Sequence, residues 1–343
     1  MIKVAVAGYG MAGRDFHCYL LRKAPGIELC GVWSRSREKR EKAEREQGGR
    51  TWETYEDLVE DAEVDLVVIA TPHHTHAPMA VRAMDAGKHV VTDKAMCMDA
   101  DEASKMIEAS RRNGVMLSVF HNRRWDWDYL TVRKVIEDGR LGAPYLFETA
   151  IMGYGEPGGW RAQADKSGGI LYDWPPHLID QALQLVPAPV RSVWCWITDR
   201  KWSVDIGSYA KLLMEFENDV LYQVEMSNLA RAGKPRWYVL GEEGALVKHG
   251  RDPQEGAMRS GEIEEAEEPP EHHARLITGD GEEVLEPVRG SWKSYYRNIS
   301  GHLNEGEELA VKAEEVREEV REVMRVLDAA MESARSGEAV RLS

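Results

Sequence analysis

The sequence predicts an α/β plus α+β fold in two domains. Residues 1–122 would form a doubly wound parallel sheet, and residues 123–343 a mostly antiparallel open sheet covered by helices. In the first third of the chain, short apolar strands alternate with helical stretches, which is typical of parallel βαβ units. After that point, strand-like runs with alternating apolar residues follow one another, which is typical of antiparallel sheets. A chain of 343 residues is long enough for two domains of ordinary size.

Composition and charge narrow the possible functions. The chain is 43% hydrophobic and 30% charged, which is typical of a soluble globular protein. No apolar run approaches the ~20 residues of a membrane span, and the start MIKVAVAG has no signal-peptide pattern. The net charge of −15 argues against nucleic acid as the main partner. We therefore expect a cytoplasmic protein that binds neither nucleic acid nor a membrane.

The first βαβ unit carries a glycine pattern. An apolar strand over residues 2–7 leads into the pattern Gly8-Tyr9-Gly10-Met11-Ala12-Gly13, a helical stretch follows, and a second strand spans 27–33. In this context the pattern predicts a dinucleotide-binding Rossmann fold. The first glycine allows the tight turn, the second admits a pyrophosphate, and the third lets helix and strand pack closely. We expect these residues to bind the cofactor: Gly8, Gly10, Met11, Ala12 and Gly13.

The end of the second strand bears on the choice between NAD and NADP. An Asp or Glu there would bind the ribose 2′-hydroxyl and favour NAD, whereas Ser34 followed by Arg35 suits a 2′-phosphate. The alternative is that Arg35 and Arg37 only begin an exposed charged helix. We expect Ser34 and Arg35 to contact the cofactor, which is NADP or NAD, with NADP favoured.

Two further strands end in polar residues. The strand over 64–70 leads into TPHHTH, and the strand over 89–92 leads into Asp93-Lys94. Three histidines suggest a metal site, but no Cys or acid lies at a ligand-like spacing, so we expect a cofactor loop and no metal. Carboxyl ends of parallel strands line the dinucleotide crevice, which places Lys94 near the reacting end of the cofactor. The expected cofactor contacts here are Thr71, Pro72, His73, His76, Asp93 and Lys94.

In the C-terminal part, the run 209–217 places Leu212, Met214 and Phe216 on one face. Asn218-Asp219 predicts a two-residue hairpin turn into the next strand. The last helix, expected over about 313–335, carries a stripe of core residues. These are Val316, Val320, Val323, Leu327 and Ala330.

Over essentially its whole length, the chain resembles the Gfo/Idh/MocA oxidoreductases, the relatives of glucose–fructose oxidoreductase and inositol dehydrogenase. The matching stretches are AGYGMAG, VDLVVIATPHHTH, AGKHVVTDKA, FHNRRWDWD, GGWR, GGILYDWPPHLIDQALQL and SWKSYYRNI. The last but one is most similar to the scyllo-inositol dehydrogenase-like branch. Where the family has Glu-Lys-Pro, this chain has Asp93-Lys94-Ala95. We expect a trans Lys94–Ala95 bond, because a cis bond before a non-proline residue costs roughly 2.5–4 kcal/mol.

The stretch GGILYDWPPHLIDQA holds Asp173 and His177, which could face one way on a helical turn. A lone histidine is more often a core residue, but the resemblance implies that Lys94, Asp173 and His177 are catalytic and bind substrate. His177 would accept the hydroxyl proton, Asp173 would orient it, and Lys94 would stabilise the developing alkoxide. The resemblance also implies Asn122 as a cofactor contact and Trp160 and Arg161 as substrate contacts.

Three functions remain open. The favoured one is an NAD(P)-dependent oxidoreductase that transfers hydride between the nicotinamide and a secondary alcohol of a cyclitol or sugar. The alternatives are an NAD-dependent glycosidase with transient sugar oxidation and a non-catalytic cofactor-sensing protein, against which the Asp173/His177 pair argues. Asp180 fits equally a sugar hydroxyl contact or a packing role. The resemblance further implies a homodimer or homotetramer through the C-terminal sheet.

Overall fold

The computed structural model describes residues 1–313 and 319–342. The chain forms two compact units. Unit 1 comprises Met1–His121 and Trp292–Met324, and unit 2 comprises Asn122–Ser291 and Arg325–Ser343. A segment from the C-terminal third of the chain thus contributes to unit 1, whereas we expected domains over 1–122 and 123–343. None of the described helices is long and apolar enough to cross a membrane.

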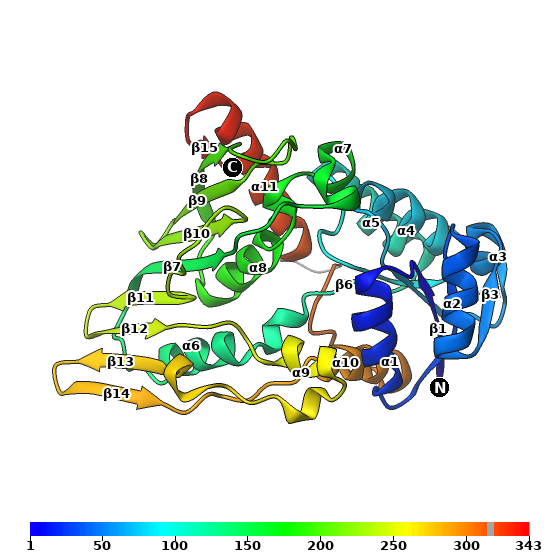
Figure 1. Cartoon of the computed structure of the whole chain (residues 1–343), viewed down its shortest axis with the longest axis horizontal. Coiled ribbons are helices and arrows are strands. Elements are labelled where there is room, and N and C mark those ends of the chain that lie inside the picture. The colour runs from blue at the N-terminus through cyan, green and yellow to red at the C-terminus, as the bar shows by residue number, and fades with distance from the viewer. Residues whose placement is uncertain (314–318, 343) are drawn as a thin grey trace. The chain divides into compact units, whose positions relative to one another are not determined.

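Unit 1 contains a six-stranded sheet in the order β3-β2-β1-β4-β5-β6, and every strand pair in it is parallel. Figure 1 labels β1, β3 and β6 of this sheet. The order reverses beside β1, which is the point where dinucleotides bind in doubly wound sheets. The strands are β1 (Ile2–Ala7), β2 (Ile27–Trp33), β3 (Arg50–Trp52), β4 (Leu66–Ile69), β5 (His89–Thr92) and β6 (Leu117–Val119).

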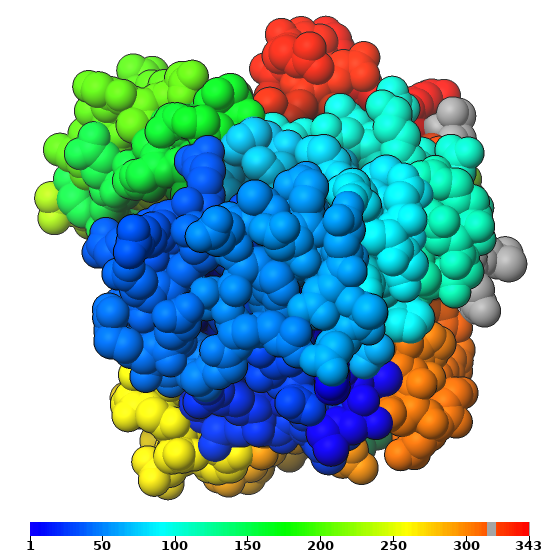
Figure 2. Space-filling model, turned by 90° about the vertical axis from the view of Figure 1, so that its right-hand side faces the viewer, coloured from blue at the N-terminus to red at the C-terminus, as the bar shows by residue number. Residues whose placement is uncertain are grey.

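Helices cover the sheet of unit 1. Within it, α4 packs beside α5, and α1 contacts α10. The segment after the glycine pattern begins as a π-helix, Ala12–Cys18, before α1. The α-helices are α1 (Tyr19–Arg22), α2 (Arg37–Gln47), α3 (Tyr55–Glu60), α4 (His76–Asp85), α5 (Ala100–Asn113) and α10 (Lys293–Glu305). Figure 2 shows the blue outer surface of unit 1, where the largely exposed α2 lies, as its charged sequence predicted.

Unit 2 contains a nine-stranded sheet in the order β14-β13-β12-β11-β7-β10-β9-β8-β15. Only β7 and β10 pair in parallel; the other described pairs are antiparallel. The strands are β7 (Pro144–Met152), β8 (Val190–Thr198), β9 (Tyr209–Phe216), β10 (Leu221–Ser227), β11 (Trp237–Gly241), β12 (Gly244–Lys248), β13 (Ala274–Thr278), β14 (Gly281–Leu285) and β15 (Val340–Arg341). Together the two sheets confirm the predicted fold class.

Helices also pack on the sheet of unit 2, and α8 contacts β10. The α-helices are α6 (Trp127–Glu137), α7 (Ala164–Ser167), α8 (Pro175–Leu185), α9 (Gln254–Ser260) and the C-terminal part of α11 (Glu319–Ser336). The core stripe predicted for the last helix is confirmed at Val320, Val323, Leu327 and Ala330, which are buried. Val316 and the rest of the expected first turn, 314–318, lie outside the described residues.

The hairpin between β9 and β10 differs from the prediction in the length of its turn. Leu212, Met214 and Phe216 are fully buried, as their alternation predicted. The amide of Phe216 donates to the carbonyl of Val220 at 2.9 Å, so the loop holds three residues, 217–219, rather than two. Asp219 has a φ of 62°. A left-handed residue at the end of the turn is typical of three-residue hairpin loops.

Candidate functional site

The glycine loop of unit 1 shows a separate physical reason for each glycine. Gly8 has a φ of 116°, and a Cβ there would lie 2.3 Å from the carbonyl oxygen of Ala70. A Cβ on Gly13 would lie 1.9 Å from the carbonyl oxygen of Gly8. At Gly10, in contrast, a Cβ would meet nothing within 4 Å. The protein itself therefore needs the first and third glycines, whereas the second leaves open backbone that fits a pyrophosphate.

This contrast predicts different outcomes for two alanine substitutions. We expect Gly13→Ala to destabilise unit 1 by about 1–3 kcal/mol, because the new methyl group meets backbone. We expect Gly10→Ala to leave the melting temperature unchanged but to raise the cofactor Kd at least about tenfold. Thermal unfolding and cofactor titration of both variants check this. Unchanged cofactor affinity in folded Gly10→Ala would contradict the role of the loop.

At the end of β2, Ser34 is buried and Arg35 is exposed. The side chain of Arg40, which we did not predict, donates from Nη1 to the carbonyl oxygens of Ser34 at 2.7 Å and of Arg35 at 3.3 Å. The hydroxyl of Tyr9, inside the glycine pattern, donates to Glu46 of α2 at 2.7 Å. These contacts attach α2 to both loops at the carboxyl edge of the sheet.

The loops after β4 and β5 are joined by His76. Its Nε2 lies 2.8 Å from the carbonyl oxygen of Thr71, and its Nδ1 lies 2.8 Å from the carbonyl oxygen of Ala95. The ring is fully buried, and burial lowers the pKa of His76. His76 can therefore affect cofactor binding only indirectly, by holding these two loops in position. His73 packs against it with 5.5 Å between ring centroids.

The peptide bond between Lys94 and Ala95 is cis, so our expectation of a trans bond is wrong. That expectation used only the intrinsic preference of a non-proline bond and omitted the surroundings. Ala95 is fully buried, and its carbonyl group meets the imidazole of His76. This loop is therefore in contact with the beginning of α4.

Asp93 and Lys94 follow directly after β5. The amide of Lys94 donates to Oδ1 of Asp93 at 2.9 Å. Behind this carboxylate lies the fully buried His17, with Nε2 3.9 Å from Oδ1 and Nδ1 2.6 Å from the hydroxyl of Tyr296. Burial alone would raise the pKa of Asp93, but His17 and the charge of Lys94 outweigh it and hold the pKa below its usual range. Asp93 is thus ionised, and it lies between His17 and the backbone amide of Lys94.

In unit 2, His177 lies in the first turn of α8 and is 5% exposed. Asp173 precedes the helix, which begins at Pro175, so the helical spacing that we assumed for the two residues does not apply. Asn122 is buried, and in the described part of the chain its Nδ2 has no hydrogen-bond partner. A buried donor in that state is available to a ligand.

The remaining predicted residues of unit 2 differ in their surroundings. The guanidinium of Arg161 lies 4.6 Å from the ring centre of Trp160, in a short helix over Gly159–Ala162. Asp180 is buried and accepts two hydrogen bonds from Arg124, at 2.9 Å from Nε and 2.6 Å from Nη2. These contacts favour the packing role that we considered for Asp180.

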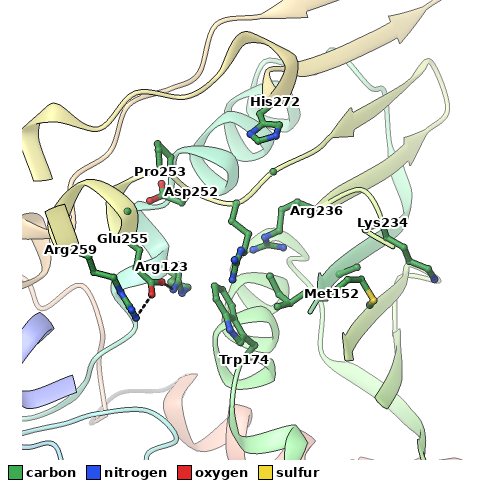
Figure 3. A pocket seen from close by; sticks show the side chains of 16 residues that line it. Arg123, Met152, Trp174, Lys234, Arg236, Asp252, Pro253, Glu255, Arg259 and His272 are labelled. Carbon is green, nitrogen blue, oxygen red and sulfur yellow. Dashed lines mark hydrogen bonds and ion pairs between the residues drawn. The ribbon is translucent and has the colours of Figure 1, made fainter. Parts of the chain in front are cut away.

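Unit 2 also contains an open cavity of about 630 Å³ beside Trp174. Figure 3 shows Arg123, Glu255 and Arg259 grouped on one side of it, Arg236 and Lys234 on another, and Trp174 between them. Trp174 follows Asp173 directly in the sequence, and its ring centroid lies 6.4 Å from that of His177. The cavity wall and the Asp173–His177 segment are therefore adjacent within one unit. Among the described residues, no cluster of His, Cys, Asp or Glu could hold a metal ion.

Comparison with known proteins decides the family. Residues 2–121 match the model of an oxidoreductase family with an NAD-binding Rossmann fold, and residues 129–247 match the GFO/IDH/MocA C-terminal domain. The chain is 32% identical over 355 residues to the scyllo-inositol 2-dehydrogenase (NADP(+)) IolW of Bacillus subtilis, over 99% of this chain and 96% of that protein. The chain belongs to the Gfo/Idh/MocA family.

Other similar proteins agree with this assignment. A scyllo-inositol 2-dehydrogenase (NAD(+)) of Bacillus subtilis is 29% identical over 253 residues, covering 71% of this chain and 73% of that protein. The solved structure of an NAD-binding protein from Listeria innocua has a TM-score of 0.86 and 28% identity, covering 99% of this chain and 96% of that one. As a Gfo/Idh/MocA protein, the chain is an NAD(P)-dependent oxidoreductase with an NAD-binding Rossmann unit.

Several residues that support the site in this Gfo/Idh/MocA protein were not predicted from the sequence. The sequence indicates His17 only weakly: it lies four residues after Gly13, in a helical stretch of mixed polar and apolar residues. Nothing in the sequence indicates Tyr296, since only the fold brings it to His17. Arg40 lies in a charged run that reads as solvent-exposed, and Arg251, in the cavity wall, lies in a polar loop.

Proposed function

We propose that this oxidoreductase oxidises a secondary alcohol of a cyclitol or sugar, or reduces the corresponding ketone, with NAD(P). The observation that carries the proposal is the position of Lys94. It follows β5 at the carboxyl edge of the sheet whose β1 ends in the open glycine loop. In doubly wound sheets this edge is where the dinucleotide binds. The names of the inositol dehydrogenase relatives support a polyol substrate.

The residues divide the chemistry between them. The nicotinamide cofactor, when bound, supplies the hydride acceptor or donor. In alcohol oxidation, His177 would take the hydroxyl proton, since a histidine titrates near neutral pH. Asp173 would orient His177 or a neighbouring hydroxyl. Lys94 would stabilise the negative charge that develops on the substrate oxygen. Cofactor contacts would come from Gly8, Gly10, Met11, Ala12, Gly13, Ser34, Arg35, Thr71, Pro72, His73, His76, Asp93, Lys94 and Asn122.

The test is a screen of polyols and sugars with NAD and NADP, followed by the absorbance of the reduced nicotinamide. A dehydrogenase produces a net change in this absorbance, whereas a glycosidase with a recycled cofactor releases an aglycone without one. We expect a net change with at least one polyol or sugar. Aglycone release without it would overturn the dehydrogenase proposal in favour of the glycosidase.

We further propose that NADP is preferred, with Arg35 at its 2′-phosphate. Replacing Arg35 with alanine should then raise the Kd of NADP by roughly 10- to 100-fold, the worth of a hydrogen bond to a charged group, and change that of NAD little. Arg37→Ala is the matched control, because Arg37 is exposed and pairs with Glu41 at 2.8 Å. Equal losses of affinity for the two cofactors in Arg35→Ala would show that the preference is wrong.

We also propose that the protein forms a homodimer or homotetramer through the sheet of unit 2. The strand register places Trp196, Leu221 and Ile277 on one face of that sheet. They are 49%, 38% and 37% exposed, respectively. Exposed apolar groups on one face are typical of an interface. A monomeric mass in light scattering would contradict this arrangement.

A further inference from the structure

We propose that the polyol or sugar substrate carries an anionic group, a phosphate or a carboxylate, and that this group binds in the cavity of unit 2 at Arg251. The inference rests on the proposed function and names the substrate class more narrowly. It depends on the charges of the cavity wall, on the state of Arg251 and on the position of Trp174.

The cavity wall reverses the charge balance of the chain. Over the whole sequence, 59 acidic residues outnumber 44 lysines and arginines. Five cationic side chains line the cavity against only two carboxylates. The cations are Arg123, Lys234, Arg236, Arg251 and Arg259, and the carboxylates are Asp252 and Glu255. Asp128 and Glu225, which lie outside this lining, pair with Arg236 and Lys234 and offset part of the excess, and the positive charge that remains attracts ligands of the opposite sign.

Among the described residues, four of these five cations form ion pairs with carboxylates. Arg236 pairs with Asp128 at 2.9 Å and Lys234 with Glu225 at 2.7 Å. Glu255 is shared by Arg123 and Arg259, at 2.9 and 2.8 Å. Such pairs fix the side chains of the wall and leave their remaining N–H groups as hydrogen-bond donors. Arg236, for example, donates hydrogen bonds from Nη1 to Thr149 and from Nη2 to Gln181, which are two of the five N–H donors of a guanidinium.

Arg251 differs from the other four cations. It is exposed, and within the described ranges its guanidinium has no ion pair. The guanidinium lies over the ring of Trp174, 5.9 Å from the centroid. The carboxylate of its neighbour Asp252 is turned to other groups, since it accepts hydrogen bonds from the amides of Trp127 at 2.7 Å and Gln254 at 2.9 Å. The charge of Arg251 is therefore available to a ligand in the cavity.

Trp174 connects this charge to the proposed chemistry. Its ring meets Arg123 at 3.9 Å and Arg251 at 5.9 Å from the centroid. In the sequence it stands between Asp173 and the helix that bears His177. A substrate whose hydroxyl meets His177 can thus extend past Trp174 into the cavity, where the guanidinium matches the oxygens of a phosphate or carboxylate.

The test compares neutral and anionic partners of one substrate. We would measure kcat and KM for myo-inositol against an inositol monophosphate, and for a hexose against its 6-phosphate and its uronic acid. We expect kcat/KM to be higher for an anionic member of a set, and the phosphate and uronic acid arms distinguish the two groups. Arg251→Gln should lower kcat/KM for the anionic member by roughly 10- to 100-fold, mainly through KM, and leave the neutral member unchanged.

Arg289→Gln is the matched control. Arg289 is also exposed and also lies over a tryptophan, 5.0 Å from the ring centroid of Trp127, but it does not line the cavity. We expect no change in this variant. Calorimetric titration of the wild type with inorganic phosphate, repeated on both variants, gives a readout independent of turnover. Binding should depend on Arg251 and not on Arg289.

The outcomes separate the two proposals. Equal kcat/KM for neutral and anionic partners, unaffected by Arg251→Gln, would overturn the anionic substrate and leave the dehydrogenase intact. Phosphate binding that depends on Arg251, without oxidation of any alcohol, would support the anion site and overturn the proposed function. Phosphate binding that Arg251→Gln does not alter would overturn the assignment of the site.

Discussion

Replacing His177 with alanine lowers kcat by roughly 10²–10⁴, the usual worth of general acid–base catalysis, if His177 moves the hydroxyl proton. The cofactor Kd changes little, because His177 would meet only the substrate. A buried core histidine predicts the opposite pattern: a lower melting temperature with turnover per folded molecule intact. Melting temperature, cofactor Kd and kcat measured on one preparation therefore discriminate between the two roles. Full activity in His177→Ala would remove it from the mechanism.

Lys94→Ala provides the partner experiment. If Lys94 stabilises charge in the same step, its loss costs a comparable factor in kcat. The double variant then loses less than the product of the single losses, because the two groups act on one proton transfer. If the loss of kcat in the double variant equals the product of the two single losses, the two residues act in separate steps.

The second large effect concerns stability and the ion pair of Arg124 with Asp180. The side chains are 9% and 2% exposed, with 2.6 Å between Nη2 and Oδ1. Asp180→Ala leaves a buried guanidinium without this carboxylate, which should cost about 3–5 kcal/mol of unfolding free energy. Denaturant titration measures this. Arg133 and Glu137 provide the control, because their shortest contact is also 2.6 Å but they are 52% and 57% exposed.

In the control, Glu137→Ala should cost no more than about 1 kcal/mol, since water screens exposed pairs. Unchanged stability in Asp180→Ala would contradict a structural role. Together with a raised KM, that result would restore the sugar hydroxyl contact that we considered for Asp180. Asp180→Asn, which keeps the shape, separates charge from packing.

The glycine loop and the strand ends were predictable because their constraints are local. A Cβ on Gly13 would meet the carbonyl oxygen of Gly8 inside the same pattern, so the pattern itself carries that part of the geometry, whereas a Cβ on Gly8 would meet Ala70 after β4. The support of Lys94 was not predictable. His17 and Tyr296 are 279 residues apart in sequence, and no local pattern connects them with Asp93.

The conformation of the Lys94–Ala95 bond was predicted wrongly for a related reason. Its local preference is trans, whereas the contact with Ala95 comes from His76, the first residue of α4. The cavity of unit 2 is assembled from β7, α9 and several loops. Its arginines lie far apart in the sequence, and only the fold brings them together.

The discontinuous composition of unit 1 has a consequence for the order in which the nascent chain can fold. Chains emerge from the ribosome N-terminus first, and N-terminal domains generally fold early. Here the first 121 residues lack Trp292–Met324, which supplies Tyr295 and Tyr296 against Phe120, at 5.0 and 5.9 Å between ring centroids. The dinucleotide-binding unit therefore completes its core only after eight strands of the other sheet, β7 to β14, have been synthesised, so folding of the N-terminal unit waits for the C-terminal third of the translation product.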